Sequence, residues 1–591
     1  MTSRPVTITP LEQPFDAAFT LPGSKSHANR AIIAACLTNG TTVLKNATPC
    51  DDVALLVENV QKMGFKVQWI DRDAGILKIM GGLPTPVVGA LHATPLQRAG
   101  MTTLDCGNAG TTLRFLTALA CVTPGEWIVT GNERMQKRPI GDLTSALRML
   151  GAEIEDNCGY PPLRIRGSLL PGGAVTLDAS RSSQFLSALL LIAPVLKNGL
   201  TVKLTSTLTS SDYITLTKKV MRDFGVKVEH ARNIFHIRPT HYSLPTTHSV
   251  VEGDWSASGA FLVLQELTSS RIAFSNLHQK SSQADAKLPV IIQKLRCTGK
   301  RVIDGSQCPD QVMNIAVLAA HRHGQTVIQN IGNLRIKECD RLMVITRELR
   351  KAGVDIKDAH DSLTIRGSAK LRAVTLNPED DHRMAMAFAI LGSMHSGIRI
   401  QNPDCVRKSY PAFFQDLKKL QDSPRCVAII GMRGAGKSTL GKNLARKLHM
   451  HHIDIDDVFI KNRGDIGKFV KKHGWAAFRR DEEQIIQEAL APGRIISLGG
   501  GAIESASTRK SLMERSVVVW LKPTQAELIA RLKKLGRPPL TKLPLEEEVK
   551  KVLKKRTPLY ASVAQITVPE TLKEAPLATL VASLLQAKCS W

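Results

Sequence analysis

The sequence has little of what marks membrane or nucleic-acid-binding proteins. Aromatic residues make up only 4% of the 591 residues, and no run of Lys and Arg is interleaved with them. Stacking platforms for single strands need that combination, so we expect no nucleic-acid partner. The longest apolar stretch, residues 185–196, contains Ser and Pro and is too short to span a bilayer, so no membrane segment is predicted.

Cysteine is present but forms no pairing pattern. The 11 cysteines are an odd number and are scattered singly without a CxxC pair. This favours reduced thiols over disulfides or a zinc cage, and it predicts a cytoplasmic location. The first residues lack a basic region followed by an apolar one, so no secretory signal is expected. A chloroplast-type leader is not expected either, because a motif described below begins at Leu21.

Negative charge is scarce relative to positive charge. The chain has 79 Lys and Arg against 52 Asp and Glu, a net charge of +27, and the parts on either side of Pro424 are both basic. A basic surface attracts nucleic acid or acidic metabolites. Since the first is not expected here, small anions are the favoured partners.

A local pattern recurs through the upstream part of the chain. A helix-like stretch ends at a Gly and is followed by two short strands with alternating apolar residues. Gly at this point fits the left-handed position after a helix. Repeats of this length indicate stacked supersecondary units. The copies centre on Gly64, Gly151, Gly225 and Gly353, with a fainter copy at Gly299.

The downstream part has a different pattern. Residues 427–430 form a predicted buried strand, which is followed by a glycine-rich loop and an amphipathic helix through Leu448. Further strands are predicted at 494–498 and 516–521, between helical segments. This alternation predicts a parallel sheet with helices on both faces. The short polar segment 421–425, which contains Pro424, is the predicted boundary between the two parts.

The downstream loop matches GxxxxGK[ST] from Gly431 to Ser438. Its glycines let backbone N–H groups surround phosphates at the start of a helix. Lys437 would reach the outer phosphates, and Ser438 would bind Mg²⁺. Other charged or glycine-rich positions follow in the same part of the chain: Asp454, Asp456, 478–482, 499–501, Arg537 and Arg556.

At this order and spacing, residues 426–591 resemble shikimate kinase. The resemblance implies ATP and shikimate as substrates, with Mg²⁺ as cofactor. Asp454 would support Mg²⁺ together with Ser438, Asp456 is the candidate base, and Arg537 would lie on a lid over ATP. The implied shikimate ligands are Asp456, Arg479, Gly500 and Arg556. The implied ATP-binding residues are Gly431, Gly434, Ala435, Gly436, Lys437, Ser438, Thr439 and Arg537.

The upstream part carries cationic motifs that lie hundreds of residues apart, and one site for two multiply charged anions explains why they coexist. The motifs are 21–30, 107–114, 134–140, 182–184, 212–213, 309–310, 333–341, 381–384 and 405–408. Together they resemble 5-enolpyruvylshikimate-3-phosphate (EPSP) synthase from about residue 10 to 420. The implied fold is α/β, with two lobes of repeated βαβαββ units and the site between them, followed here by the P-loop kinase domain.

The resemblance implies that shikimate 3-phosphate and phosphoenolpyruvate react without a metal or organic cofactor. Asp310 would be the base for the 5-hydroxyl, and Glu338 and Lys25 are the proton-transfer candidates, with their individual roles left open. The implied phosphoenolpyruvate ligands are Lys25, Gly110, Arg138, Arg341, Arg383 and Lys408. The implied shikimate 3-phosphate ligands are Lys25, Ser26, Arg30, Ser182, Ser183, Gln184, Ser210, Tyr213, Asp310, Asn333 and Lys337.

Some positions depart from the synthase pattern. They are His27, Ala28, Phe115, Trp255 and the Gln283-Ala-Asp segment. None removes a charged site residue. Phe115 follows Arg114, where it could alter the enolpyruvate pocket.

The main hypothesis is therefore a bifunctional enzyme of aromatic amino-acid biosynthesis. Residues 1–420 would be the synthase, with one lobe of about 1–24 plus 252–420 and another of about 25–251. Residues 421–425 would be the linker, and 426–591 the kinase. The alternatives are a nucleic-acid-dependent NTPase and a chain in which one half is an inactive regulatory module. Oligomeric state and transfer of the intermediate between the sites are left open.

Overall fold

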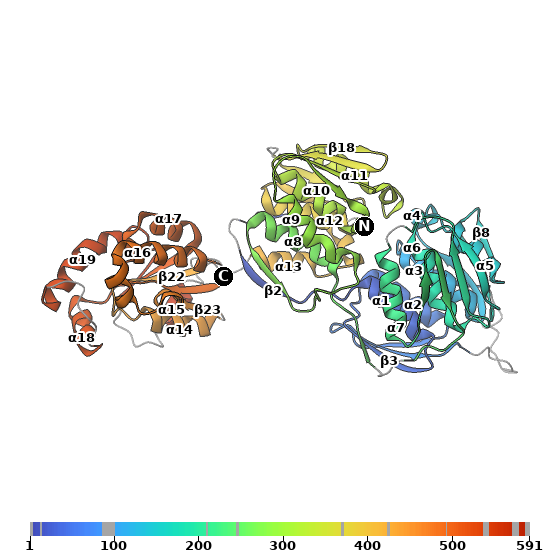
Figure 1. The fold of residues 1–591 in the computed structure, drawn as a ribbon, viewed down its shortest axis with the longest axis horizontal. Helices are drawn as coiled ribbons and strands as arrows, with labels where there is room; N and C mark the ends of the chain where they lie inside the picture. The colour runs from blue at the N-terminus through green and yellow to red at the C-terminus, as the bar shows by residue number, and fades with distance from the viewer. Residues whose placement is uncertain are drawn as a thin grey trace. The chain divides into compact units, whose positions relative to one another are not determined.

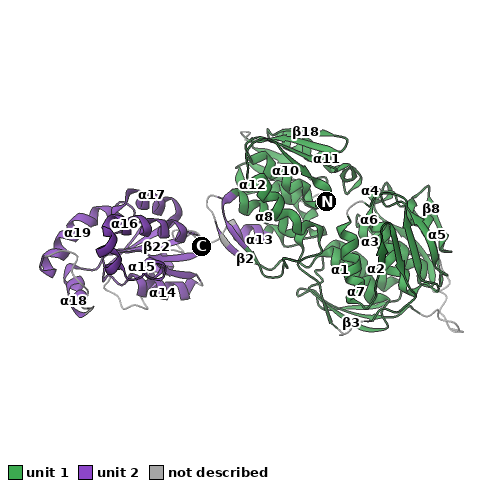
Figure 2. Cartoon of the chain, in the orientation of Figure 1, with its two compact units in different colours: residues 1–10, 18–267, 273–414 green, residues 11–17, 268–272, 415–591 purple. Residues whose placement is uncertain are grey.

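The structure is a computed structural model that describes residues 4–11, 15–84, 101–208, 211–243, 248–367, 371–421, 426–448, 450–491, 493–535, 543–569 and 578–584. The chain divides into two compact units (Figure 2). One comprises residues 1–10, 18–267 and 273–414, and the other comprises residues 11–17, 268–272 and 415–591. The predicted linker falls almost wholly outside the described residues, so the exact domain boundaries stay a prediction.

The first unit repeats one βαβαββ arrangement, shown clearly by a sheet with the strand order β6-β7-β9-β8. Strands β6 and β7 are parallel, and β9 runs antiparallel to both β7 and β8. A helix, α3, connects the parallel pair, and α4 and α5 lead into the closing hairpin. The elements are β6 (Thr102–Asp105), α3 (Gly110–Val122), β7 (Gly125–Thr130), α4 (Glu133–Gln136), α5 (Gly141–Met149), β8 (Glu153–Asn157) and β9 (Tyr160–Gly167).

Two further sheets of the same order complete this lobe, and the first strand of one of them, β14, comes from late in the sequence. One sheet contains β10 (Gly173–Leu177), α6 (Ser183–Ile192), β11 (Leu200–Leu204), α7 (Asp212–Asp223), β12 (Glu229–Ala231) and β13 (Ile234–Ile237). The other contains α1 (Lys25–Cys36), β3 (Gly40–Lys45), α2 (Asp51–Lys62), β4 (Lys66–Asp71), β5 (Ile76–Gly81) and β14 (His248–Val250).

One continuous hydrophobic core, from Ala28 to Val251, holds this lobe together. Helices α1, α2, α3 and α6 contact one another, while β3 and β8 lie at the periphery (Figure 1). Nearly every residue of α3 and α6 is buried. Helices that are apolar on all sides suit such an interior position.

The other lobe of the first unit has one full copy of the repeat and two smaller sheets. The full copy consists of β16 (Arg301–Asp304), α10 (Val312–His321), β17 (Gln325–Gln329), α11 (Arg341–Lys351), β18 (Asp355–Ala359) and β19 (Ser362–Arg366). The smaller sheets and their helices are β1 (Val6–Thr7), β20 (Val374–Leu376), α12 (His382–Met394) and β21 (Ile398–Ile400), and β2 (Asp16–Phe19), α8 (Trp255–Thr268), β15 (Arg271–Phe274) and α9 (Leu288–Leu295). Helix α13 (Phe413–Gln421) follows them.

The repeat glycines predicted from the sequence behave as expected at four positions. Gly64, Gly151, Gly225 and Gly353 have φ values of +94°, +93°, +79° and +96°, which L side chains rarely adopt. The fifth copy was wrong in kind: Gly299 precedes β16, the first strand of a unit rather than part of its closing hairpin. A helix–Gly–strand pattern does not encode where the strand enters a sheet.

The second unit contains the predicted parallel sheet. Its strand order is β23-β24-β22-β25-β26, and every neighbouring pair is parallel. Strands β22 and β25 are buried along their whole length, as expected when helices cover both faces of a sheet. The strands are β22 (Cys426–Ile430), β23 (His451–Asp454), β24 (Arg494–Ser497), β25 (Ser516–Leu521) and β26 (Ile566–Val568). The helices are α14 (Lys437–Leu448), α15 (Ile455–Arg463), α16 (Ile466–Ala489), α17 (Ala506–Arg515), α18 (Gln525–Leu535) and α19 (Leu545–Ala561).

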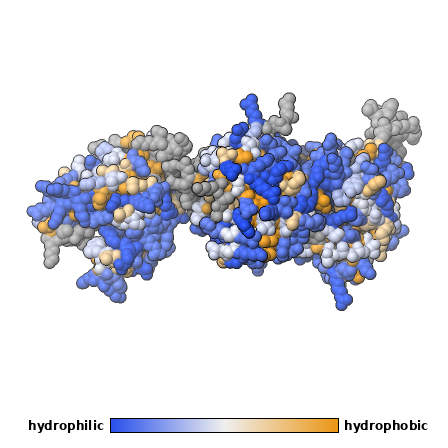
Figure 3. Space-filling view, turned by 90° about the horizontal axis from the view of Figure 1, so that it is seen from above, coloured by the Kyte–Doolittle hydropathy of each residue, from blue (hydrophilic) through white to orange (hydrophobic). Residues whose placement is uncertain are grey.

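Within the described ranges, none of the helices combines the length and apolarity needed to cross a bilayer. Hydrophilic residues dominate the face seen in Figure 3, and hydrophobic ones are scattered among them.

Candidate functional site

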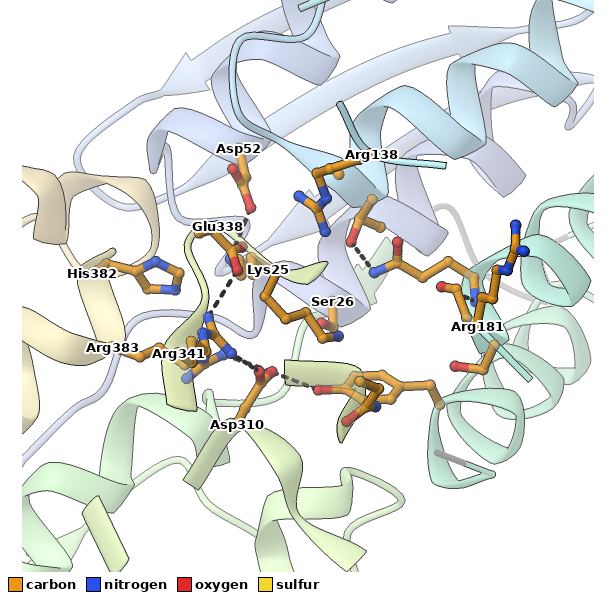
Figure 4. Close-up of a pocket in the computed structure, with 18 residues that line it drawn as sticks. Lys25, Ser26, Asp52, Arg138, Arg181, Asp310, Glu338, Arg341, His382 and Arg383 are labelled. Carbon is orange, nitrogen blue, oxygen red and sulfur yellow. Dashed lines mark hydrogen bonds and ion pairs between the residues drawn. The ribbon is translucent and has the colours of Figure 1, made fainter. Parts of the chain in front are cut away.

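A pocket in the first unit is lined by residues from both lobes (Figure 4). It brings together fourteen of the residues predicted from the synthase resemblance. They are Lys25, Ser26, Gly110, Arg138, Ser182, Ser183, Gln184, Tyr213, Asp310, Asn333, Lys337, Glu338, Arg341 and Arg383.

The other three predicted synthase residues lie elsewhere. Arg30 is buried beside the pocket, and its guanidinium donates to Thr217, Ser187 and the carbonyls of Ser26 and Tyr213. Lys408 is not among the lining residues, but its Nζ lies 3.3 Å from Glu338. Ser210 falls outside the described residues.

Lys25 is the first residue of α1, so its side chain starts from a fixed backbone. The side chain of Ser24 accepts from the N–H of His27 at the start of this helix. The N–H of Ser24 itself donates to the carbonyl of Glu252, which ties the helix start to the strand connection at residues 248–254. The Nζ of Lys25 pairs with Asp52 at 2.8 Å, and although burial works against it, this carboxylate raises the pKa of Lys25 above its ordinary value.

Gly110, at the start of α3, lies against two buried guanidiniums. A Cβ at this position would lie 2.5 Å from Nη1 of Arg114 and 2.7 Å from Nη1 of Arg138. Burial lowers the pKa of both arginines, and Nε and Nη1 of Arg138 have no hydrogen-bond partner among the described residues. Unpaired buried donors are costly, so this cradle fits a multiply charged anion.

Arg341 is the centre of the charged cluster on the opposite side. It is 1% exposed and pairs with Asp310 at 3.0 Å, Glu338 at 2.9 Å and Asp381 at 2.7 Å. Arg383 pairs with the second oxygen of Asp310 at 3.0 Å. Such fork-shaped donors suit a planar carboxylate.

The two acids of this cluster are held ionised. Burial alone would raise the pKa of Asp310, but Arg383 and Arg341 hold it well below its usual range. Arg341 and Lys408 likewise outweigh burial and hold the pKa of Glu338 far below its ordinary value. Tyr213, from the other lobe, donates its hydroxyl to Asp310 at 2.8 Å.

Burial also changes other groups in and around the pocket. It lowers the pKa of Lys337 to about 8, and it holds the pKa of His382 well below its ordinary value. Next to Asp310, burial and the charge of that residue raise the pKa of Asp285 to about 7.

Sequence reasoning missed four of the lining residues: Asp52, Thr111, Arg181 and His382. Three of them adjoin predicted site residues along the chain, and that adjacency was the available signal. Asp52 had no such signal beyond its place at a helix start.

The departures from the synthase pattern do not enter the pocket. Phe115 is buried, with the guanidinium carbon of Arg30 5.2 Å from its ring centroid, and it does not line the cavity. Trp255 and Gln283 are linked by a backbone hydrogen bond, and Gln283 donates to the carbonyl of Gly253. The expected change at Phe115 therefore acts on the support of Arg30.

The second unit holds the nucleotide loop between β22 and α14. Gly431, Gly434 and Gly436 have φ values of +143°, +80° and +93°, so glycine is required for this turn. The Nζ of Lys437 donates to the carbonyl of Met432 at 2.9 Å, which folds the lysine over the loop. Ala435 and Thr439 lie in the same loop and helix start, whereas Arg537 lies outside the described residues.

Ser438 and Asp454 meet across the end of the sheet. The hydroxyl of Ser438 donates to Asp454, which also accepts from the N–H of Asp456 at the start of α15. The described residues contain no cluster of three or more His, Cys, Asp or Glu side chains. A hydroxyl and a carboxylate fit Mg²⁺, which usually keeps waters and substrate phosphates as its other ligands.

The glycines after β24 bring the remaining predicted kinase residues together. A Cβ on Gly499 would meet Glu482 and Asp456, and one on Gly501 would meet Arg479. The hydroxyl of Tyr560 donates to the carbonyl of Gly500 at 2.6 Å. The glycine segment is therefore the floor of a site whose walls carry both acids and a guanidinium.

An adjoining pocket contains the two predicted arginines of this site. Arg479 pairs with Glu482, and Arg556 pairs with Glu504 at 2.7 Å. Burial raises the pKa of Glu482. The lining also includes residues that sequence reasoning missed: Trp475, Ala476, Glu504, Lys551, Val552 and Lys555.

The fold and the two sites define a chain with two enzyme domains that handle small anions. The EPSP synthase family (3-phosphoshikimate 1-carboxyvinyltransferase) matches residues 11–417, and the shikimate kinase family matches residues 433–587. The 3-phosphoshikimate 1-carboxyvinyltransferases of Erwinia tasmaniensis and Shewanella denitrificans are each 36% identical over 423 residues, covering 68% of this chain and 96% of theirs. An EPSP synthase structure from Acinetobacter baumannii has a TM-score of 0.57 at 22% identity, covering 71% of this chain and 98% of that one, so the fold is shared. The chain belongs to the EPSP synthase family, with a shikimate kinase domain fused to it in one polypeptide.

Proposed function

We propose that the chain carries out two consecutive reactions, in which the product of the kinase domain is the substrate of the synthase domain. Residues 426–591 transfer a phosphoryl group from ATP to shikimate. Residues 1–420 join the enolpyruvyl group of phosphoenolpyruvate to the 5-hydroxyl of shikimate 3-phosphate and release phosphate. Residues 421–425 link the domains, and the synthase lobes comprise about 1–24 plus 252–420 and about 25–251.

In the kinase domain, Asp456 accepts the proton of the reacting hydroxyl while Arg479, Gly500 and Arg556 hold shikimate. The convergence of Asp456 and Arg479 on the glycine floor supports this assignment. Loop residues from Gly431 to Thr439 surround the nucleotide phosphates, and Arg537 closes over ATP. Positioning and charge neutralisation are the main work of such a site.

Ser438 and Asp454 would hold Mg²⁺ beside the loop. Their direct hydrogen bond supports this, because it brings two oxygen ligands to one point. When bound, Mg²⁺ neutralises phosphate charge. The remaining work belongs to Lys437, whose ammonium moves from the Met432 carbonyl to the outer phosphates.

In the synthase domain, Asp310 removes the proton of the 5-hydroxyl. Its present ion pairs with Arg341 and Arg383 keep it ionised but weakly basic. When the carboxylate of phosphoenolpyruvate occupies these guanidiniums, Asp310 loses part of that stabilisation and becomes a stronger base. Glu338 and Lys25 move the proton to and from the methylene carbon.

The phosphate of phosphoenolpyruvate occupies the cradle formed by Lys25, Gly110, Arg138 and Lys408. The observation that carries this assignment is the buried guanidinium of Arg138, whose Nε and Nη1 lack partners among the described residues. Developing negative charge in this water-poor site is stabilised by donors already in place.

Shikimate 3-phosphate spans both lobes of the synthase domain. Its proposed ligands are Lys25, Ser26, Arg30, Ser182, Ser183, Gln184, Ser210, Tyr213, Asp310, Asn333 and Lys337. The partners are thus small molecules, without nucleic acid or membrane, in the cytoplasm.

The test is a pair of single substitutions assayed with each reaction separately. Lys437→Ala should abolish phosphorylation of shikimate and leave the synthase rate unchanged, whereas Asp310→Ala should do the reverse. If either substitution abolishes both activities while both domains stay folded, the two-site proposal is wrong.

A further inference from the structure

The loop that carries Lys337 and Glu338 is anchored within its own lobe by Arg335. Its guanidinium donates to Asp340 at 3.0 Å, to Asp358 at 3.0 Å and to the carbonyl of His360 at 3.1 Å. These contacts fix the loop to the β18–β19 hairpin. They leave its position relative to the opposite lobe undetermined.

A second arginine reaches the same loop from the opposite lobe. Nε of Arg134 donates to the carbonyl of Lys337 at 3.1 Å, and Nη2 donates to the carbonyl of Arg335 at 3.2 Å. Both acceptors are main-chain atoms. The contact therefore sets the backbone from which Lys337 and Glu338 project, and leaves their side chains free for substrate.

Arg134 belongs to a segment, residues 131–138, that is itself well held. Asn132 accepts from the N–H of Met135 at 3.0 Å, and its own N–H donates to the carbonyl of Gly107 at 3.0 Å. Met135 is fully buried, and Gln136 donates to the carbonyl of Gly131 at 3.1 Å. Movement of this segment thus carries the glycine turn before α3 with it.

Arg138 lies at the end of this segment and faces the pocket. One short segment therefore presents an arginine to the proposed phosphate and, four residues earlier, another arginine to the loop on the opposite lobe. The segment connects the two halves of the reaction site.

Other contacts across the cleft have a different character. The hydrogen bond from Tyr213 to Asp310 uses groups that substrate would engage. The pair Lys287–Asp212, at 2.7 Å, lies at the rim with side chains 46% and 27% exposed. Exposed pairs contribute little, and this one touches no residue of the site loop.

We propose that Arg134 is a positioning residue that latches residues 335–337 when the lobes close, and so places Lys337 and Glu338 for the synthase reaction. The proposal rests on the roles given above to those two residues. A misplacement of reacting groups by about 1 Å can lower a rate on the order of 100-fold. Loss of the latch should accordingly reduce turnover more than substrate binding.

The experiment compares Arg134→Gln, Arg134→Lys and Lys287→Gln in the full-length chain. Steady-state kinetics give kcat for the synthase reaction, and calorimetric titration gives the Kd for shikimate 3-phosphate. The kinase rate of the same preparation reports on the amount of folded chain. Glu338→Gln serves as the check on the proposed site.

Arg134→Gln should lower the synthase kcat at least tenfold, while the Kd and the kinase rate change less than threefold. Arg134→Lys, which keeps a charged donor for one carbonyl, should recover part of the loss, and Lys287→Gln should stay within twofold of the unchanged chain. A synthase kcat within twofold for either Arg134 variant overturns the latch. So does an equal loss in kcat and in binding of shikimate 3-phosphate. If Glu338→Gln keeps full activity, the proposed roles in the site have failed instead.

Discussion

Gly110 provides a direct way to probe the proposed phosphate cradle. In Gly110→Ala, the new Cβ would lie 2.5 Å from Arg114 Nη1 and 2.7 Å from Arg138 Nη1. Ordinary contact between such atoms is near 3.5 Å, so the guanidiniums must retreat by roughly 1 Å. The side chains can move that far, but their aim at the anion changes.

The expected cost falls on phosphoenolpyruvate. Weakening one or two charge-assisted hydrogen bonds by about 1.4 kcal/mol in total raises its KM about tenfold. The Kd for shikimate 3-phosphate should change less than threefold, because most of its proposed ligands lie elsewhere. Initial rates of phosphate release at varied phosphoenolpyruvate, together with calorimetric titration of shikimate 3-phosphate, measure both quantities.

Gly64→Ala is the matched control. Gly64 has a φ of +94° at the end of α2, away from the pocket, and Ala there strains the backbone by about 1 kcal/mol. It should lower the melting temperature without changing the KM for phosphoenolpyruvate. The reasoning is refuted if Gly110→Ala leaves that KM within twofold, or if Gly64→Ala raises it equally.

Three further predictions concern the charges of the two sites. Arg138→Met removes a buried, poorly partnered charge, so it should raise the melting midpoint of the synthase domain in calorimetry while abolishing its activity; a fall in the midpoint contradicts this. Burial lowers the pKa of Lys337 to about 8, below its ordinary value of 10.5, so the affinity for shikimate 3-phosphate should decline as pH rises through 8. Between pH 8 and 10.5 the folded chain binds fewer protons than the unfolded chain, so stability relative to Lys337→Met should rise with pH, and a falling difference would oppose the assignment. Ser438→Ala should raise the Mg²⁺ concentration needed for half-maximal kinase activity about tenfold, and an unchanged requirement would remove Ser438 from the metal site.

Much of the architecture was readable because local signals and the fold agree. The glycines at positions 64, 151, 225 and 353 adopt the left-handed conformation that the helix–Gly–strand pattern predicted. The buried run at residues 427–430 and the loop after it form the expected strand and turn. The sequence could not show that β14 joins the sheet of β3, because pairing between strands about 200 residues apart leaves no local mark.

The candidate site was readable for a related reason. Cations and acids from widely separated motifs, such as Lys25, Arg138 and Arg341, do meet in one pocket. What was missed depends on side-chain packing: Asp52 is a lining residue because α2 approaches α1, and Trp475 lines the kinase pocket because Gly474, with a φ of +82°, kinks α16. Neither position carries a motif of its own.

The most direct measurement of the central claim is complementation between two inactivated chains. Lys437→Ala and Asp310→Ala proteins are supplied, singly and mixed, with shikimate, ATP, Mg²⁺ and phosphoenolpyruvate. Two independent sites joined by a diffusible intermediate predict that neither protein alone forms the enolpyruvyl product from shikimate and that the mixture does. Product from either protein alone, or none from a mixture of folded proteins, would contradict the account.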